Sequence, residues 1–522
     1  MTAVQVKPGE VMPLSRRLSL CPDPLDVFTA WTDHGQRPDT LLLESADVTT
    51  RQGERSLLVL RSAMRLEGRG NTVTAVPLSP NGLSIMPWLG KQLFDKAQVK
   101  VEQDKATFEF APFPRQGSEL ERLKAPSPLD AVRALARNWK LTSQPAPLTL
   151  GVFGVFAYDL LEVYEDLPRS LDDWHGYPDF VFWLPEVMAV IHHRERSTTL
   201  LTHVFGGAMD QAAYADAIAA MEKLTATCEA PEVRPSPFVR GMDQPVEVDQ
   251  SDEEYGLAVQ DAKRHIVAGD VFQIVPSRTF RRPCPDPLAA YRKLRAKNPS
   301  PYMFYVRRKE DVLYGSSPET SVKVSGQPRR VEIRPIAGTR PRGFAADGTI
   351  DADLDSRLEA ELRLDEKELA EHMMLVDLAR NDVARVSVPG TRRVDRLLTV
   401  DRYSHVMHLV SYVSGELRSD LDALHAYQAS MNMGTLVGAP KLKAAQLLRK
   451  LEATRRGPYG GAVGYYSWEG EFDTAIVIRS ALVQNGMASV RAGAGVVYDS
   501  VPEAEAAETR RKAQAVLSAL DP

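Results

Sequence analysis

Cysteine is scarce in this 522-residue sequence, and long apolar runs and blocks of charge of one sign are absent. The three cysteines, Cys21, Cys228 and Cys284, lie far apart without a CxxC motif, which excludes a disulfide framework and argues against a cysteine-ligated zinc or iron–sulfur site. The net charge of −5 has no basic block behind it, which disfavours wholesale nucleic-acid binding. No apolar run reaches the roughly 18 residues that span a bilayer. Residues 1–17 lack the apolar segment of a signal peptide, so we expect a cytoplasmic protein.

Strands and helices alternate irregularly along the chain. Together with hairpin turns, this pattern predicts antiparallel sheet and therefore an α+β fold. Residues 229–250 carry four prolines and no periodicity, and we interpret them as a linker or a long crossing loop. They divide the chain into an N-terminal region, residues 1–240, which contributes to a shared core, and a second region, residues 241–522.

The residue patterns also predict individual elements. A turn is expected at Pro80-Asn81-Gly82 and a hairpin turn at Glu469-Gly470, and Ser251 with Glu254 forms a helix-capping box. Strands are expected over residues 41–48, 56–113, 151–160 and 179–193. Helices are expected over residues 14–34, 128–140, 208–227, 251–268, 351–383, 422–431, 439–452 and 502–520.

Two of the predicted helices carry paired carboxylates. Glu368 and Glu371 are three residues apart, so they share one helix face. Glu505, Glu508 and Lys512 share a face of the last helix in the same way. Two such pairs can hold one hard cation, and Mg²⁺ prefers oxygen ligands. The alternative is that each pair is a solvated helix face.

Glycine-rich segments form a second constellation, over residues 335–343, 433–441, 458–466 and 491–497. Glycine lets the backbone approach a ligand and aim N–H groups at an anion. Together with Tyr459, Arg479 and Lys512, these segments are candidates for binding a small polycarboxylate, since arginine pairs with a carboxylate through two hydrogen bonds. The alternative is hairpin turns and close strand packing. Residues 434–441 lack the spacing of a phosphate-binding loop.

Familiar hydrolase and zinc-protease signatures, GxSxG and HExxH, are absent. His408 lies in an apolar stretch, where a histidine is more often a satisfied core residue than a catalytic one.

In its ordered motifs the chain resembles the chorismate-utilising enzymes, and most closely the anthranilate synthase branch of that family. The resemblance covers nearly the whole chain and is densest from residue 251. It implies an α+β fold with a two-part architecture of packed antiparallel sheets and surrounding helices. It lies in LLLESADV (41–48), QSDEEYG (250–256), FQIVPSR (272–278), NPSPYMFY (298–305), GSSPET (315–320), PIAGTRPRG (335–343), LDSR (354–357), KELAEHMMLVDLARND (367–382), VDRYSHVMHLVS (400–411), MNMGTLVGAPK (431–441), YGGAVGYY (459–466), VIRSALV (477–483), AGAGVV (492–497) and SVPEAEAAETR (500–510).

The resemblance implies a magnesium-dependent lyase that converts chorismate and ammonia to anthranilate and pyruvate, the first step of tryptophan biosynthesis. It assigns Glu371 and Glu508 as magnesium ligands, supported by Glu368 and Glu505, and it assigns Glu319 as the general acid, His408 to pyruvate loss and Thr435 to a place beside the ring pocket. The substrate-binding residues that it implies are Tyr459 and Arg479 for the enolpyruvyl carboxylate, Lys512, and the chorismate-contacting backbone of Gly338, Thr339, Gly493, Ala494 and Gly495.

Two positions distinguish branches of the family. Gln273 stands where isochorismate and salicylate synthases carry a lysine that activates water, and a neutral amide cannot deprotonate water. Ala337 stands where aminodeoxychorismate synthases carry a nucleophilic lysine. The remaining alternatives are 2-amino-2-deoxyisochorismate synthase, which stops before pyruvate loss, and a non-catalytic tryptophan-sensing paralogue. His408 favours the full reaction.

The same resemblance implies feedback inhibition by tryptophan and a partner. Residues 41–48 match the family's tryptophan site, to which Ser45, Arg55, Pro301, Tyr302 and Met303 also belong, so residues 1–240 would carry the regulatory site and residues 241–522 the chorismate site. Arg55 stands where relatives often have lysine. The sequence contains no glutaminase nucleophile motif. Ammonia would therefore come from a glutamine amidotransferase subunit (component II), in a heterotetramer, or be taken up free.

Overall fold

Strands from both ends of the chain combine into one sheet. The computed structural model describes residues 5–45, 55–143, 148, 150–168, 172–207, 210–233, 236–237, 244–403 and 406–521. Within these residues, 23 strands form one continuous, almost entirely antiparallel network, and β12 (Gln273–Ile274) pairs separately with β21 (Gly438–Ala439). The network comprises β1 (Glu10–Leu18), β2 (Thr40–Glu44), β3 (Arg55–Arg69), β4 (Thr72–Pro77), β5 (Ala97–Val101), β6 (Ala106–Phe110), β7 (Lys140–Leu141), β8 (Gly151–Phe156), β9 (Phe180–His192), β10 (Ser197–Phe205), β11 (Glu247–Val248), β13 (Ser277–Pro283), β14 (Tyr302–Arg307), β15 (Val312–Ser317), β16 (Thr320–Ser325), β17 (Arg330–Ile333), β18 (Ile336–Pro341), β19 (Arg393–Arg402), β20 (Val406–Glu416), β22 (Ala462–Ser467), β23 (Phe472–Ile476), β24 (Ser480–Gln484) and β25 (Met487–Gly493).

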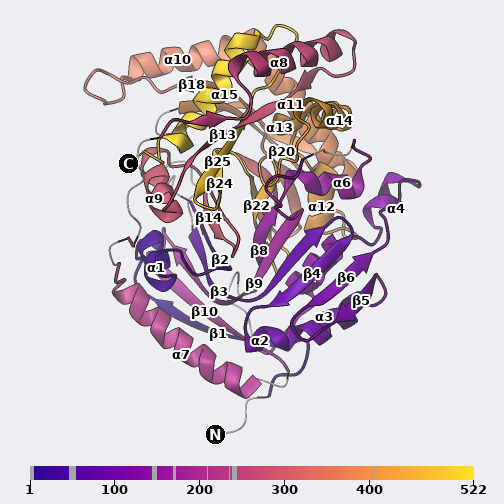
Figure 1. The fold of residues 1–522 in the computed structure, drawn as a ribbon, viewed down its shortest axis with the longest axis vertical. Helices are drawn as coiled ribbons and strands as arrows, with labels where there is room; N and C mark the ends of the chain where they lie inside the picture. Colours follow the sequence, from indigo (N-terminus) through magenta and orange to yellow (C-terminus); the bar gives the residue numbers. More distant parts are fainter. Residues whose placement is uncertain are drawn as a thin grey trace.

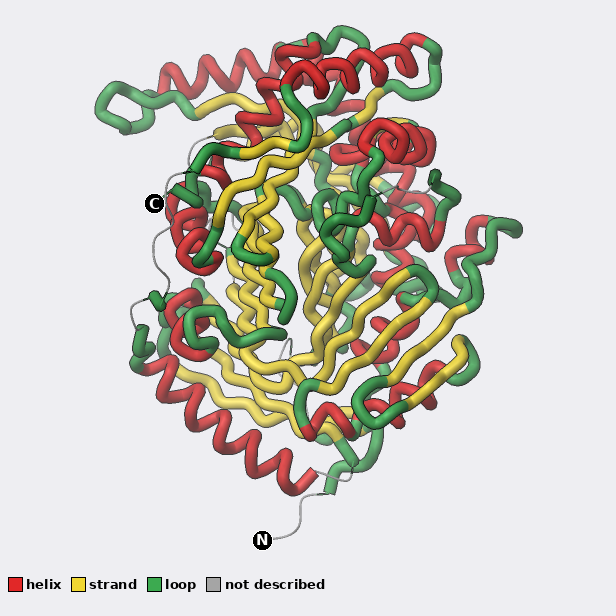
Figure 2. The backbone as a smooth tube through the Cα atoms, viewed as in Figure 1, coloured by secondary structure: helices red, strands yellow, loops and turns green. Residues whose placement is uncertain are grey.

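Helices cover the outer faces of the strands, which stack against each other in the middle of the molecule (Figures 1 and 2). One helical group packs on β2, β3, β9, β10, β14, β15 and β25: α1 (Pro24–Trp31), α7 (Asp210–Glu229), α9 (Pro287–Lys297) and α15 (Pro502–Leu517). The opposite side carries α2 (Pro80–Leu83), α3 (Ile85–Leu93), α4 (Glu119–Leu123), α5 (Leu129–Arg137), η1 (Tyr158–Leu160), α6 (Leu161–Tyr164), α11 (Glu366–Val386), α12 (Ala423–Ser430), α13 (Gly434–Val437) and α14 (Lys441–Glu452). Helix α8 (Asp252–Val267) packs on α15. Helix α10 (Ala352–Leu364) packs on β18 and β20.

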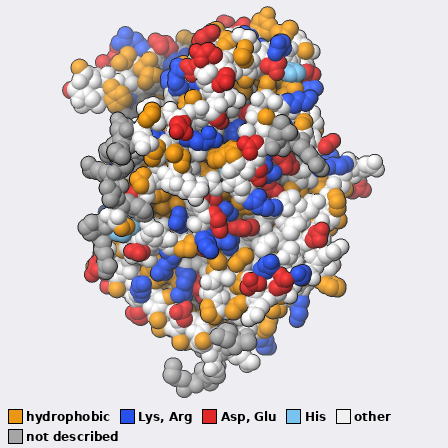
Figure 3. All heavy atoms as spheres, viewed as in Figure 1, with side chains coloured by type: hydrophobic (Ala, Val, Ile, Leu, Met, Phe, Trp, Pro, Cys, Tyr) orange, Lys and Arg blue, Asp and Glu red, His pale blue; other side chains and the backbone are white. Residues whose placement is uncertain are grey.

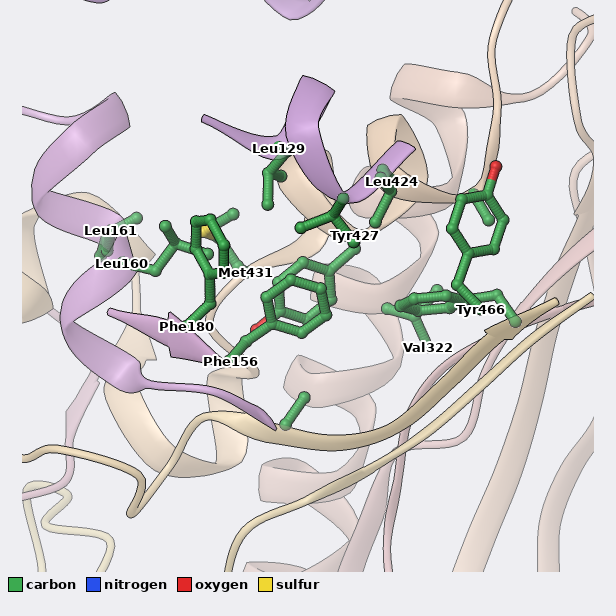
Figure 4. Close-up of a cluster of buried hydrophobic side chains, with 14 of the residues drawn as sticks. Leu129, Phe156, Leu160, Leu161, Phe180, Val322, Leu424, Tyr427, Met431 and Tyr466 are labelled. Atoms are coloured by element: carbon green, nitrogen blue, oxygen red, sulfur yellow. The ribbon is translucent and has the colours of Figure 1, made fainter. Parts of the chain in front are cut away.

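Alternation along the strands fills separate cores. On β22, Val463 and Tyr465 face the core between the stacked strands, whereas Ala462 and Tyr466 face the outer core under the helices. In that outer core Phe156 stacks on Tyr427, with ring centroids 4.1 Å apart (Figure 4). Side chains from the beginning and the end of the chain thus share one apolar cluster.

Backbone pairing also joins the two halves of the sequence. Strand β2 pairs with β14 from Thr40–Arg307 to Glu44–Met303, and β8 pairs with β22 from Gly151–Ser467 to Phe156–Ala462. The predicted division at residues 229–250 therefore marks a crossing between interlocked regions. Part of that segment, residues 234–235 and 238–243, and the end of LLLESADV, residues 46–48, lie outside the described residues.

Most expected elements are present, and several predictions were wrong in detail. The strands expected over 56–113 are interrupted by α3, and the strand expected over 151–160 ends at Phe156, before η1. Residues 14–18 belong to β1, because a helix over 14–34 would contain Pro22 and Pro24 in its interior; α1 instead begins at Pro24, with the Asp23 side chain accepting from Leu25 N–H. The expected turn at residues 80–82 is the first turn of α2, capped by Ser79, and α3 follows it. The helix expected over 351–383 is two helices, because Asp365 ends α10 and caps α11.

Surface charge is mixed. Basic and acidic side chains are interspersed over the described part of the face in Figure 3. Within the described part of the chain, no helix has the length and apolarity needed to cross a membrane.

Candidate active site and a second cavity

The carboxylate helices meet the glycine-rich segments at one end of the molecule, where α8, α10, α11 and α15 gather (Figure 1). Gln273 Nε2 donates to Glu371 Oε1 at 2.7 Å, which joins β12 to α11. Lys512 Nζ pairs with Glu508 Oε1 at 2.7 Å and donates to the Gly493 carbonyl at 2.9 Å, which joins α15 to the end of β25. These contacts hold the predicted carboxylates beside the predicted substrate-binding segments.

Glycine is required where the backbone comes close to these groups. A Cβ at Gly495 would lie 2.7 Å from Gln273 Nε2 and 3.4 Å from Glu371 Oε1. Gly338 has φ +81°, and a Cβ there would lie 3.3 Å from Glu368 Oε2. The close packing expected under the alternative interpretation is therefore present, and it places backbone directly beside the carboxylates.

The carboxylates influence one another's ionisation. Burial raises the pKa of Glu371, with Glu368 and Glu508 adding repulsion. Burial also raises the pKa of Glu505. Burial opposes ionisation of Glu508 as well, but the Lys512 ion pair outweighs it and lowers the pKa of Glu508.

The carboxylates fit a hard cation by their chemistry. Within the described residues, no three His, Cys, Asp or Glu side chains stand close enough together to form a metal cage by themselves. Glu371 on α11 and Glu508 on α15 nevertheless repel each other electrostatically and offer only oxygen donors, which suits Mg²⁺ that keeps water and ligand oxygens in its shell. Glu368 Oε1 accepts from Arg340 Nη1 at 3.2 Å, so Glu368 is already engaged.

Glu319 is the most strongly perturbed carboxyl at this end of the molecule. It lies between β15 and β16, is buried, and accepts a hydrogen bond from Thr435 Oγ1 at 3.0 Å. Burial raises the pKa of Glu319 to about 8, although Thr435, Arg479 and Lys512 act in the opposite direction. The carboxyl is therefore protonated at neutral pH and can donate a proton.

His408 lies on β20 opposite Thr339 of β18. Its Nδ1 is 2.9 Å from Thr339 Oγ1, and Tyr403 packs edge-on against its ring. Burial lowers the pKa of His408 to about 4, with Arg479 contributing, so the imidazole is neutral at physiological pH.

Tyr459 and Arg479 lie on the loops that precede β22 and β24. Tyr459 is buried, and a Cβ at Gly493 would lie 3.2 Å from its hydroxyl oxygen. Burial lowers the pKa of Arg479, whereas Tyr459, Glu508 and Glu319 favour its charge. Arg479 is thus electrostatically linked to the predicted acid and to a predicted metal ligand. Ala494 N–H hydrogen-bonds to the Tyr255 hydroxyl at 3.3 Å and is directed into the protein.

All five residues predicted for a tryptophan site line a second cavity, of about 350 Å³. Ser45 and Arg55 come from the N-terminal region, and Pro301, Tyr302 and Met303 come from the start of β14. Arg55 Nη2 donates to the Tyr465 hydroxyl at 2.7 Å and pairs with Glu471 at 3.1 Å.

Sequence reasoning missed other charged residues of this cavity. Glu44 is held by the Tyr291 hydroxyl at 2.6 Å and by Arg295 Nε at 3.0 Å. The remaining ones are Lys323, Arg334, Glu471 and Asp473. Among these charged residues, only Glu44 could have been found from the sequence, because it lies next to Ser45. The others reach the cavity through the register of the strands, which no local sequence pattern specifies.

Comparisons with known proteins identify the family of this chain. The family model described as chorismate binding enzyme matches residues 95–518. The chain is 49% identical over 508 residues to anthranilate synthase component 1 of Vibrio cholerae, covering 97% of this chain and 96% of that protein. It is 49% identical over 488 residues to anthranilate synthase component 1 of Escherichia coli, covering 93% and 92%. Among solved structures, anthranilate synthase component I of Streptococcus pneumoniae aligns with a TM-score of 0.67 and 28% identity, covering 89% of this chain and 92% of that one.

Proposed function

Because this chain belongs to the chorismate-binding enzyme family, we propose that it is the large subunit of an anthranilate synthase. In this function it converts chorismate and ammonia to anthranilate and pyruvate, the first step of tryptophan biosynthesis. The catalytic residues all belong to residues 241–522, whereas the regulatory cavity takes Ser45 and Arg55 from residues 1–240.

The Gln273–Glu371 hydrogen bond is the observation that carries this proposal. The Gln273 amide N–H donates to the Glu371 carboxylate at 2.7 Å and so fixes its position. An amide is no base, so Gln273 cannot activate water. At the position where a lysine nucleophile would attack the ring, Ala337 has no reactive group. Ammonia is therefore the nucleophile.

Glu319 acts as the general acid. Its buried carboxyl holds a proton up to about pH 8, and Thr435 fixes its orientation. It protonates the 4-hydroxyl as that group leaves the ring, which avoids expelling hydroxide.

The substrate's carboxylates are bound by charge and backbone. Arg479 and Tyr459 bind the enolpyruvyl carboxylate, and Lys512 adds positive charge beside Gly493. The backbone against which the ring lies is formed by Gly338, Thr339, Gly493, Ala494 and Gly495. Glu371 and Glu508 would hold Mg²⁺, supported by Glu368 and Glu505, and the ion would neutralise the ring carboxylate.

His408 serves the second half of the reaction. It is neutral at physiological pH and is oriented by Thr339, so it can accept the proton released when pyruvate leaves and the ring becomes aromatic.

The ammonia comes from a separate glutamine amidotransferase subunit, in a heterotetramer. Tryptophan binds in the second cavity and inhibits. The apolar residues Met303 and Pro301 suit the indole ring of tryptophan, and the polar residues Ser45, Arg55 and Glu44 suit the carboxylate and ammonium groups of tryptophan.

One assay tests the catalytic proposal. The isolated chain, chorismate, ammonium and Mg²⁺ should yield anthranilate, followed by its fluorescence, and an equal amount of pyruvate. Isochorismate, or an aminated product that retains pyruvate, would instead assign the chain to another branch of the family.

A further inference from the structure

A buried arginine lies directly behind the candidate active site. Arg456, in the turn between α14 and Tyr459, is 4% exposed. Its guanidinium donates twice to Glu452, at 2.9 and 2.7 Å. It also donates to two backbone carbonyls, that of Leu436 at 2.6 Å and that of Val275 at 2.7 Å. Together these hydrogen bonds fix the plane of the guanidinium.

Both carbonyls belong to segments that carry candidate catalytic groups. Leu436 follows Thr435, the hydrogen-bond donor to Glu319, on the one-turn helix α13. Val275 follows the strand β12, which carries Gln273, the donor to Glu371. The two segments also pair directly, with Val275 N–H donating to the Val437 carbonyl at 3.1 Å. The planar guanidinium braces this junction by binding a carbonyl on each side of it.

The same guanidinium also contacts aromatic rings. Its Cζ lies 4.5 Å from the ring centroid of Tyr158 and 5.8 Å from that of Tyr459. Tyr459 follows Pro458, whose ring fixes its own backbone φ and so stiffens the short link between Arg456 and Tyr459. The position of Tyr459 is therefore tied to Arg456 as well.

The counter-charge of Arg456 extends the network to a fourth segment. Glu452 pairs with Arg491 Nη2 at 2.9 Å and accepts from Ser277 N–H at 2.8 Å. Arg491 lies two residues before Gly493, at the end of β25. Burial opposes ionisation of Glu452, but Arg456 and Arg491 outweigh it and lower its pKa to about 2. The carboxylate is ionised throughout the physiological range.

Neither stability nor substrate binding accounts for this network. Buried ion pairs are often no more stabilising than apolar groups of the same volume, because desolvation offsets their attraction. The cavity that Arg456 and Arg491 line has a volume of about 20 Å³, room for a water molecule but none for a substrate. The explanation that remains is that the network holds the neighbouring segments in a precise arrangement.

We propose that Arg456 is a positioning residue, whose guanidinium holds the Thr435 segment, the Gln273 segment and Tyr459 in their catalytic arrangement. This inference rests on the proposed anthranilate synthase function. Lysine at this position keeps the charge but cannot bind two carbonyls and both carboxylate oxygens in one plane.

The test compares Arg456→Lys with Arg308→Lys. Arg308 is a matched control: it is 5% exposed, pairs with Asp311 at 2.9 and 3.0 Å and lies 4.8 Å from the Tyr177 ring, in the turn between β14 and β15. We expect Arg456→Lys to lower kcat about 10- to 100-fold, the loss typical of a displaced catalytic group. Arg308→Lys should keep kcat within about twofold, at a comparable loss of thermal stability.

Hydrogen exchange supplies a readout that does not depend on activity. In Arg456→Lys, backbone amides of residues 273–275 and 433–437 should exchange faster than in the wild-type chain, and in Arg308→Lys they should not. Equal kcat and equal exchange in the two variants would overturn the inference. An inactive wild-type chain would overturn the proposed function, while exchange would still decide the role of Arg456.

A second variant applies if Arg456→Lys does not fold. Tyr158→Leu removes the ring beside the guanidinium and leaves its ion pairs in place. It should raise exchange in the same two segments and lower kcat several-fold. Unchanged exchange and kcat in this variant would also contradict the role given to Arg456.

Discussion

The candidate active site and the second cavity differ in how the chain builds them. The active site takes its side chains from α11, α13, α15, β12, β18, β20 and adjoining loops, all within residues 241–522. The second cavity is lined by both halves of the chain, with Ser45 and Arg55 facing Pro301, Tyr302 and Met303. Its charges are already paired, as in Arg55–Glu471 and Lys323–Asp473 at 3.1 and 3.2 Å. The active site also has ion pairs, such as Lys512–Glu508 at 2.7 Å, but it leaves like charges opposed, at Glu371 and Glu508. A site whose opposed carboxylates suit a cation and a site whose charges are already paired should respond differently to mutation.

The largest expected effect is at the metal ligands. Glu371→Gln or Glu508→Gln should lower anthranilate formation by about 10³-fold or more, since charge stabilisation by a metal is worth several kcal/mol. The exposed Glu503 on the same helix as Glu508 offers a control, because Glu503→Gln should keep full activity. Tryptophan binding to the second cavity should survive all three changes. Near-normal turnover of both ligand variants in the presence of a chelator would refute the metal assignment.

A second large effect is expected at Glu319. Glu319→Gln should lower kcat by about 10²- to 10⁴-fold, the contribution of a general acid. In the wild-type enzyme kcat should fall as pH rises through about 8, where the carboxyl loses its proton. Thr435→Val should move that fall to higher pH, because the Thr435 hydrogen bond favours the ionised form. A pH–rate profile measures both, and a profile in which Thr435→Val leaves the alkaline limb in place would contradict the acid's assignment.

The same carboxyl affects stability. Its pKa in the folded chain, about 8, lies above its ordinary value of 4.5. Its favourable contribution is therefore complete below about pH 4.5 and is lost as pH rises towards 8. Glu319→Gln removes this dependence, so the wild-type chain should lose more stability than the variant between pH 5 and pH 8, in denaturant titrations at both values. Parallel losses would show that the carboxyl is ionised in the folded chain.

Substitution of His408 is expected to change which product the reaction releases. His408→Ala should slow pyruvate release more than amination, because the imidazole acts after the amine is added. Chromatography of the reaction should reveal an aminated intermediate that still carries the enolpyruvyl group. Loss of amination itself would show that the role assigned to His408 is wrong.

Sequence reasoning was strongest where a local period carries the chemistry. The spacing of Glu368 with Glu371, and of Glu505 with Glu508, was sufficient to place each pair on one helix face. It was weakest where burial decides which of several similar residues has a role in the site. Arg455 and Arg456 are adjacent and chemically identical, yet only the second is enclosed by Leu436, Val275 and two tyrosines. The ionic lining of the second cavity, such as Lys323 with Asp473, depends on the register of β16 on β23, which no local pattern specifies.

The smallest expected effect concerns the second cavity and its coupling to catalysis. Tyr302 lines that cavity, and its hydroxyl contacts Thr320 Oγ1 and Asp473 Oδ1, each at 3.0 Å. Thr320 directly follows Glu319 in the chain, so a contact of the cavity adjoins the predicted acid. Inhibition requires that tryptophan bind the less active state more tightly, and a preference of about 10- to 100-fold corresponds to about 1.4–2.7 kcal/mol. By reciprocity, chorismate should weaken tryptophan binding by the same factor.

Ser45→Ala should relieve inhibition by tryptophan with little change in uninhibited turnover, because Ser45 lines the cavity and contributes nothing to the carboxylate site. Calorimetric titration with tryptophan, with and without chorismate, measures the coupling. Equal affinity under both conditions would show that the cavity, even if it binds tryptophan, is not linked to the active site. In that case the contrast between the two sites would be one of construction alone, and the contact between Tyr302 and Thr320 would serve packing.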